Sequence, residues 1–82
     1  MNALGNLIEE GFRTASIVNP NGQQFKLGEK AYCVWKSIRE EKPKGRIITQ
    51  LKEKFNIEDD QVETEYTTII DQLTKIKLIQ IT

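Results

Sequence analysis

The side chains on which most protein chemistry depends are scarce in this 82-residue chain, which has no histidine and a single cysteine, Cys33. One cysteine cannot form a disulfide within the chain, and without histidine no Cys/His zinc site can be assembled. A Ser–His or Cys–His nucleophile pair is excluded for the same reason. Carboxylates, lysines and tyrosines remain for catalysis, in a chain too short to enclose much of a pocket. We therefore expect a protein that is not an enzyme and that uses no metal and no cofactor.

Cys33 itself has two interpretations. Cysteine is among the residue types most often found inside proteins, so we expect a small buried hydrophobic side chain. The alternative is a reactive thiol, which a neighbouring cation would favour. Lys36 is the one nearby residue that supports this alternative. The first interpretation is therefore preferred.

Length and composition indicate one domain, spanning residues 1–82. Hydrophobic residues make up 38% and charged residues 29%, the balance of a globular protein. No apolar run approaches the roughly 18 residues that a transmembrane helix needs. The segment Met1–Glu10 lacks the basic region and apolar stretch of a signal peptide. We therefore expect a cytoplasmic protein with no membrane partner.

The formal net charge is zero, but the charges are segregated along the chain. Residues 26–54 hold nine Lys or Arg and four Glu, a sum of +5. Residues 55–74 hold six acidic residues and no basic residue, a sum of −6. An acidic segment of this kind is repelled by nucleic-acid phosphates, so the segregation bears on the kind of partner.

Two short strands joined by a tight turn form the strongest local pattern. The segments Phe12–Val18 and Gln23–Leu27 have the residue types of strands. Between them, Asn19-Pro20-Asn21-Gly22 matches a type I turn, with Gly22 as the left-handed residue of a three-residue hairpin loop. The pattern of residues 1–11 does not select one secondary structure. A further strand, a short helix and a loosely ordered segment all remain open.

Apolar residues at helical spacing predict three helices, over 28–41, 44–54 and from 58 onward. Pro43 separates the first two, because proline breaks a helix. The third has a start signal, since Gln61 follows Glu58 at the spacing of a capping box. The apolar residues Leu78, Ile79 and Ile81 are expected to run extended and to close the core. A small antiparallel sheet followed by three helices is an α+β layout, and we predict a winged helix-turn-helix.

A known family shares the order and spacing of several apolar groups in this chain. These groups are Phe25-Lys26-Leu27, Ala31 with Val34-Trp35, Ile48…Leu51…Phe55, Val62…Leu73 and Leu78-Ile79. On these groups, the run from about Thr14 to Ile79 resembles the PqqD-like family, also called RiPP recognition elements. Its members are small winged-helix domains that bind the leader segment of ribosomally made precursor peptides. The chain departs from the family at Gly28, where an Asn or similar cap is usual. It departs also at Lys77, where a Gly is usual, and this leaves the left-handed turn after the third helix in doubt.

The resemblance implies a peptide-binding site. Family members bind by strand addition, so an extended leader would pair with the edge strand Gln23, Gln24, Phe25, Lys26 and Leu27. Helical phase then predicts which residues of the third helix line the groove beside that strand. These are an off-axis row with a tyrosine at its rim, namely Glu63, Tyr66, Thr67, Ile70 and Thr74.

The resemblance also implies partners. The chain would present its peptide to a separate modifying enzyme, of the radical SAM, protease or cyclase type, in RiPP or PQQ-type biosynthesis. Homodimerisation through exposed strand edges stays open. The alternative function is that of a winged-helix transcription regulator, whose third helix enters the major groove of DNA. The acidic residues of segment 55–74 make nucleic acid the less favoured partner.

Overall fold

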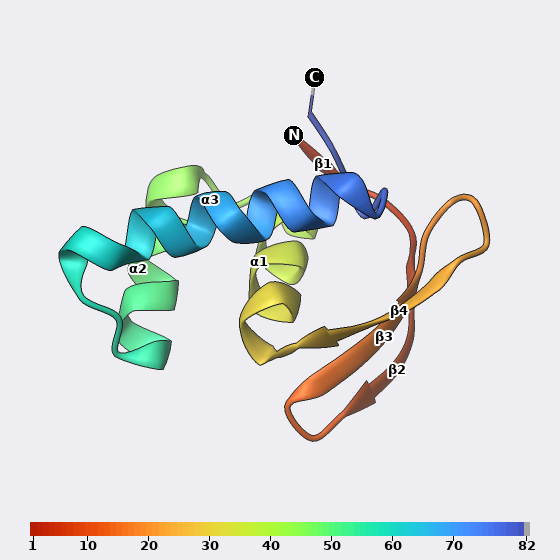
Figure 1. Ribbon diagram of the computed structural model, residues 1–82, viewed down its shortest axis with the longest axis horizontal. Helices are drawn as coiled ribbons and strands as arrows, with labels where there is room; N and C mark the ends of the chain where they lie inside the picture. The colour runs from red at the N-terminus through yellow and green to blue at the C-terminus, as the bar shows by residue number, and fades with distance from the viewer. Residues whose placement is uncertain (82) are drawn as a thin grey trace.

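The computed structural model describes residues 1–81, which form five strands and three helices (Figure 1). Their order is β1 (Asn2–Ala3), β2 (Asn6–Gly11), β3 (Thr14–Val18), β4 (Gln24–Gly28), α1 (Glu29–Arg39), α2 (Lys44–Phe55), α3 (Asp59–Lys75) and β5 (Ile79–Gln80). The chain is α+β, and a three-stranded antiparallel sheet precedes the helices, as the sequence predicts.

The sheet has the strand order β2-β3-β4, so β3 is central and β2 and β4 are its two edges. The predicted hairpin joins β3 to β4. The N–H of Gly22 donates to the carbonyl of Asn19 at 3.0 Å, and Gly22 has a φ of +86°. The N–H of Asn19 donates to the carbonyl of Gln23 at 2.8 Å, which closes a three-residue loop. The turn prediction is therefore confirmed.

Asn19 also ties this turn to the far end of the chain. The residue is only 3% exposed, although it is an amide. Its Oδ1 accepts the N–H groups of Asn21 and Gln23, and its Nδ2 donates to Gln23 Oε1 and, at 2.9 Å, to the carbonyl of Ile76. Ile76 follows α3, so one buried side chain joins the sheet to the last helix.

The core lies between the sheet and the three helices. β3 alternates in burial, with Ala15 and Ile17 pointing inward. Each helix contributes a buried apolar stripe, as the helical spacing predicts. The largest fully buried apolar side chains are Trp35, Ile17, Ile47, Leu51, Leu73, Leu78, Ile79 and Val34.

The N-terminal segment forms strands. Of the secondary structures considered for residues 1–11, the structure has strands, at Asn2–Ala3 and Asn6–Gly11, and not the short helix. β1 pairs with β5, so the two ends of the chain lie together (Figure 1). This pairing bears out the extended C-terminal tail, although Ile81 is 62% exposed and does not reach the core. Strand β3 begins later than predicted, because Arg13 adopts a φ of +62° in the turn that precedes it.

At one helix end a predicted cap is incomplete, and at another a turn that the sequence left in doubt is formed. Glu58 is the N-cap of α3, as predicted, but its side chain caps no backbone N–H, because glutamate is a poor cap. At the other end, Lys77 adopts the left-handed conformation with a φ of +64°. The N–H groups of Lys77 and Leu78 donate to the carbonyls of Thr74 and Leu73 at 3.1 and 2.9 Å. These are the two bonds of a Schellman turn, which forms here without glycine.

Candidate peptide-binding site

The candidate site begins with β4, an edge strand whose outer backbone groups pair with no other strand of residues 1–81. The strand alternates as expected, since Gln24 and Lys26 are exposed, Phe25 is half-buried and Leu27 is buried. Of the five residues predicted for the edge, the structure places four in β4. Gln23 instead belongs to the turn, where its backbone bonds to Asn19.

An open groove of about 500 Å³ lies where the end of β4 passes into α1. The start of α1 forms one wall, α3 forms the facing wall, and the end of α2 closes one side. Its lining residues are Gly28, Glu29, Lys30, Ala31, Phe55, Thr64, Glu65, Thr68, Ile69 and Gln72. Ala31, Phe55 and Ile69 give it an apolar floor suited to an aliphatic or aromatic side chain.

An ion pair crosses the rim of this groove. Lys30 Nζ lies 2.9 Å from Glu65 Oε1, and both side chains are about half exposed. Lys30 also lies 5.9 Å from the centre of the Phe55 ring, within the range of a cation–π contact. A pair this exposed contributes little to stability. Its carboxylate and ammonium are therefore free to exchange partners with a bound ligand.

The residues that the sequence predicts for the groove wall on α3 do not line this groove. None of Glu63, Tyr66, Thr67, Ile70 and Thr74 lines the groove beside β4. Glu63 pairs with Lys44 at 3.6 Å, and Thr74 lines a separate hollow near the β1–β5 ribbon. Tyr66 is a core residue, 4% exposed, and its hydroxyl is buried without a hydrogen-bond partner among the described residues. Burial raises the pKa of Tyr66.

The opposite flank of α3 supplies the wall, through Glu65, Thr68 and Gln72. Sequence reasoning missed these residues because a helix with a buried stripe has two polar flanks of similar composition. Which flank meets the sheet depends on the direction in which the chain crosses the core. No local sequence signal reports that direction. The row predicted from the sequence, from Glu63 to Thr74, lies on the side of α2 and the β1–β5 ribbon.

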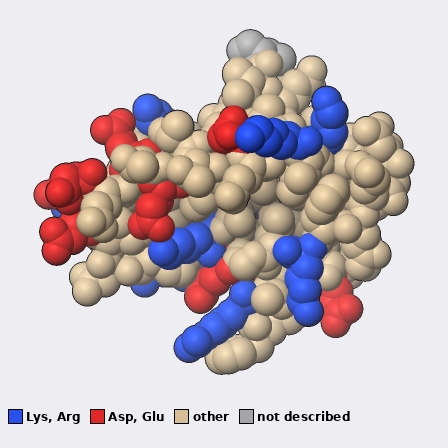
Figure 2. All heavy atoms as spheres, in the orientation of Figure 1, with Lys and Arg blue, Asp and Glu red and all other residues tan. Residues whose placement is uncertain are grey.

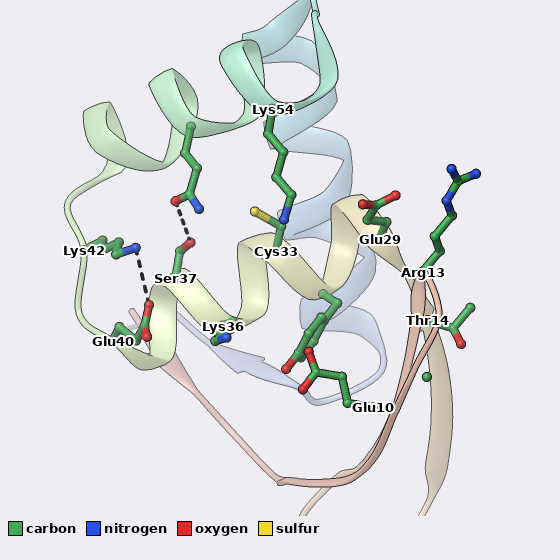
Figure 3. A pocket seen from close by; sticks show the side chains of 13 residues that line it. Glu10, Arg13, Thr14, Glu29, Cys33, Lys36, Ser37, Glu40, Lys42 and Lys54 are labelled. Carbon is green, nitrogen blue, oxygen red and sulfur yellow. Dashed lines mark hydrogen bonds and ion pairs between the residues drawn. The ribbon is translucent and has the colours of Figure 1, made fainter.

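A second, polar cavity of about 370 Å³ lies between β2, α1 and α2 (Figure 3). Cys33 borders it but is only 7% exposed, in agreement with the preferred interpretation as a buried side chain. The Ser37 hydroxyl donates to Gln50 Oε1 at 3.3 Å, and Lys42 Nζ lies 3.4 Å from Glu40 Oε1. Among residues 1–81, no group of three or more His, Cys, Asp or Glu is placed to hold a metal ion.

Folding brings the basic segment 26–54 and the acidic segment 55–74 into contact. Lysines of α1 and α2 pair with carboxylates of α3, as in Lys44–Glu63 and Lys52–Asp59. Carboxylates still gather at the end of the molecule where α3 begins (Figure 2). No helix within residues 1–81 is both long enough and apolar enough to cross a membrane.

The fold and site thus define a small α+β protein with an open sheet edge beside an apolar groove. The family model of coenzyme PQQ synthesis protein D (PqqD) matches residues 14–79, which is most of the chain. The chain belongs to the PqqD family, as the resemblance in its sequence indicates. This membership connects it with the biosynthesis of PQQ and of ribosomally made peptide products. Comparisons with curated proteins and with solved structures gave no match.

Proposed function

We propose that this protein binds the leader segment of a ribosomal precursor peptide in the cytoplasm and presents it to a separate modifying enzyme, without performing chemistry itself. The observation that carries the proposal is the unpaired edge of β4 beside an apolar groove, in a member of the PqqD family. An extended leader would pair with Gln24–Gly28 and place an apolar side chain against Ala31, Phe55 and Ile69.

The energetics require both parts of this site. The five residues of β4 span about 17 Å, and four backbone hydrogen bonds along them would contribute about 0.5 to 1.5 kcal/mol each. Association costs roughly 4 to 15 kcal/mol, so backbone pairing alone gives little net affinity. Two or three apolar anchors at about 1.5 to 3 kcal/mol each would bring binding to the micromolar range or tighter. The groove provides the place for the first of them.

DNA binding by a winged helix-turn-helix is the alternative function, and the charges of α3 oppose it. In that mode α3 would enter the major groove with Glu58, Asp59, Asp60 and Glu63 facing phosphates. Lys44 and Lys52, two of the nearby cations, already pair with α3 carboxylates. We therefore assign the winged-helix arrangement, as part of this proposal, to peptide binding.

Two neighbouring threonines on α3 allow a matched test, because both are exposed and they lie on opposite flanks of the helix. The probe is a synthetic leader peptide of a candidate precursor, sought among the small reading frames that flank the gene of this protein, and it is titrated by calorimetry. Thr68→Lys fills the groove and should weaken binding at least about tenfold, the effect of losing one apolar anchor. Thr67→Lys adds the same charge on the other flank and should leave the affinity unchanged.

Amide shifts of the labelled protein locate the peptide in the same titration. We expect them at Gln24–Gly28 and Thr64–Gln72, and none with duplex DNA. If Thr67→Lys weakens binding and Thr68→Lys does not, the peptide lies along Glu63, Thr67 and Ile70, the row predicted from the sequence. If the leader leaves all amides unmoved while DNA shifts residues 36–54, the proposed function is wrong.

A further inference from the structure

The other edge of the sheet, β2, is more exposed than any other strand. All six residues from Asn6 to Gly11 are exposed, and no strand of residues 1–81 pairs with the outer side of β2. Leu7 is 41% and Ile8 53% exposed, and Phe12, at the tip of the following turn, is 86% exposed. Exposed strand edges are normally protected by charge, proline or a covering element, because they pair readily with other chains. β2 carries two such charges, Glu9 and Glu10, and a bulge between Leu7 and Glu9, yet an apolar pair and an aromatic ring remain exposed along it.

One face of β2 borders the polar cavity. Leu7 is opposite Ile17, and Glu10 is opposite Ala15, so both lie on the face that the core residues of β3 share. At the Glu10 end of the strand, the polar cavity separates β2 from α1, and Glu10 and Lys36 border it from the two sides (Figure 3). Burial, and then the charge of Glu10, raise the pKa of Tyr32 in the same cavity. The space can receive side chains of an additional strand paired with β2.

The start of this edge is held rigidly. Trp35 Nε1 donates to the carbonyl of Leu4 at 3.1 Å, and an Arg39 guanidinium nitrogen donates to the carbonyl of Gly5 at 3.1 Å. Gly5 has a φ of +87°, and a Cβ at this position would lie 2.2 Å from the carbonyl oxygen of Val18. Because its entry is fixed to α1 in this way, β2 is presented in one position without needing to be ordered by a ligand.

We propose that β2 is a second docking edge, which binds an extended segment of the modifying enzyme while the leader occupies β4. This inference rests on the proposed function for the identity of the partner. The two edges lie on opposite sides of β3, so both can be occupied at once. The enzyme segment would cover Leu7, Ile8 and Phe12 with apolar side chains and would place a Lys or Arg opposite Glu9 or Glu10.

The charges of β2 favour such a partner over a second copy of this chain. A two-fold pairing centred on Asn6–Gly11 would set Leu7 against Glu10 and Ile8 against Glu9 of the other copy. The four carboxylates would then crowd within two positions of each other, which is destabilising. Neither Glu9 nor Glu10 forms an ion pair within residues 1–81. The cavity itself carries four cations and three carboxylates, so it selects weakly by charge.

Two synthetic peptides test the edge itself. One has the sequence Thr-Val-Lys-Val-Arg-Val-Thr, and the other carries Glu in place of its Lys and Arg. In titrations of the labelled protein, the basic peptide should shift amides of residues 6–12 and bind at least about fivefold more tightly than the acidic one, the combined effect of two cross-strand charge pairs. The double variant Glu9→Gln/Glu10→Gln should abolish the difference. Equal binding of the two peptides, or shifts confined to β4, would refute the proposal.

A modifying enzyme of the radical SAM, protease or cyclase type, sought among the genes that flank the gene of this protein, tests the biological partner. The variant Ile8→Thr/Phe12→Ser changes exposed side chains only, and it should reduce enzyme binding at least about tenfold while leader affinity is unchanged. The opposite pattern would refute docking at β2. A dimer in sedimentation velocity that this variant dissociates would also refute it, in favour of a second copy. If the unaltered protein binds no leader, the proposed function is wrong, whatever the result for enzyme docking.

Discussion

Lys77 occupies a left-handed position that glycine adopts at far lower cost, so Lys77→Gly should stabilise the protein. The φ of Lys77 is +64°, and its N–H donates to the carbonyl of Thr74 at 3.1 Å, so the turn is fully formed despite the side chain. A left-handed conformation costs a non-glycine residue roughly 1 to 2 kcal/mol. Glycine removes that cost but gives the unfolded chain additional freedom, which offsets about 0.4 to 1 kcal/mol.

The expected net gain is about 0.5 to 1 kcal/mol in the free energy of unfolding. For a domain of this size, that gain corresponds to roughly 2 to 8 °C in the melting temperature. Urea unfolding followed by circular dichroism measures the first quantity, and a thermal scan measures the second. Lys75→Gly is the control, because it removes the same charge at the last residue of α3, where glycine is unfavourable by up to about 1 kcal/mol. It also removes the pair with Asp71, which is exposed and contributes little.

The two variants should therefore change stability in opposite directions. If Lys77→Gly destabilises the protein as much as Lys75→Gly does, the lysine at position 77 is not strained. The turn after α3 would then owe its conformation to contacts of the lysine side chain, and the reasoning from backbone geometry would be wrong.

Three further predictions concern the core, the entry to β2 and the start of α3. Tyr66→Phe removes a buried hydroxyl that has no partner among the described residues, so urea unfolding at pH 7 should show unchanged stability or a gain of up to about 1 kcal/mol. Because burial raises the pKa of Tyr66, the unfolded state ionises first above about pH 10; stability should fall there in the unaltered protein and fall less in the variant. Gly5→Ala places a methyl group against the Val18 carbonyl and should cost at least about 2 kcal/mol, read as a lower urea midpoint; an unchanged midpoint would show that the backbone relaxes freely there. Glu58→Asp keeps the charge at the start of α3 and adds a side chain able to cap it, so we expect a gain of about 0.5 to 1 kcal/mol by the same assay, and no gain would mean that the N-cap geometry is unsuitable.

The elements that the sequence predicts well are those with a local cause. Gly22 and Asn19 determine the hairpin because the turn needs a left-handed residue and an amide acceptor at those positions. Pro43 separates α1 from α2, and the apolar spacing of α3 reports its buried stripe. In each case the physical cause lies within a few residues of its effect.

What the sequence does not predict depends on contacts across the fold. β2 is exposed on both faces, so it shows no alternation of apolar and polar residues, and a strand could not be told from a helix. The flank of α3 that faces β4 depends on how the helix crosses the core, so the sequence predicts Thr67 for the groove wall, whereas Thr68 lines the groove beside β4. Lys77 forms a glycine-type turn because the buried Leu78 beyond it has to reach the core.

Under the proposed function, the amide of Asn19 has a consequence for the kinetics of peptide capture. Because it joins the β3–β4 turn to the carbonyl of Ile76, β4 and the end of α3 cannot separate unless a buried hydrogen bond breaks. The spacing between strand and helix is thus set when the protein folds. A leader that fits this spacing meets a receptor already in its bound shape, so its association rate should depend on encounter and not on a slow opening step. A bulkier peptide would have to wait for that bond to open.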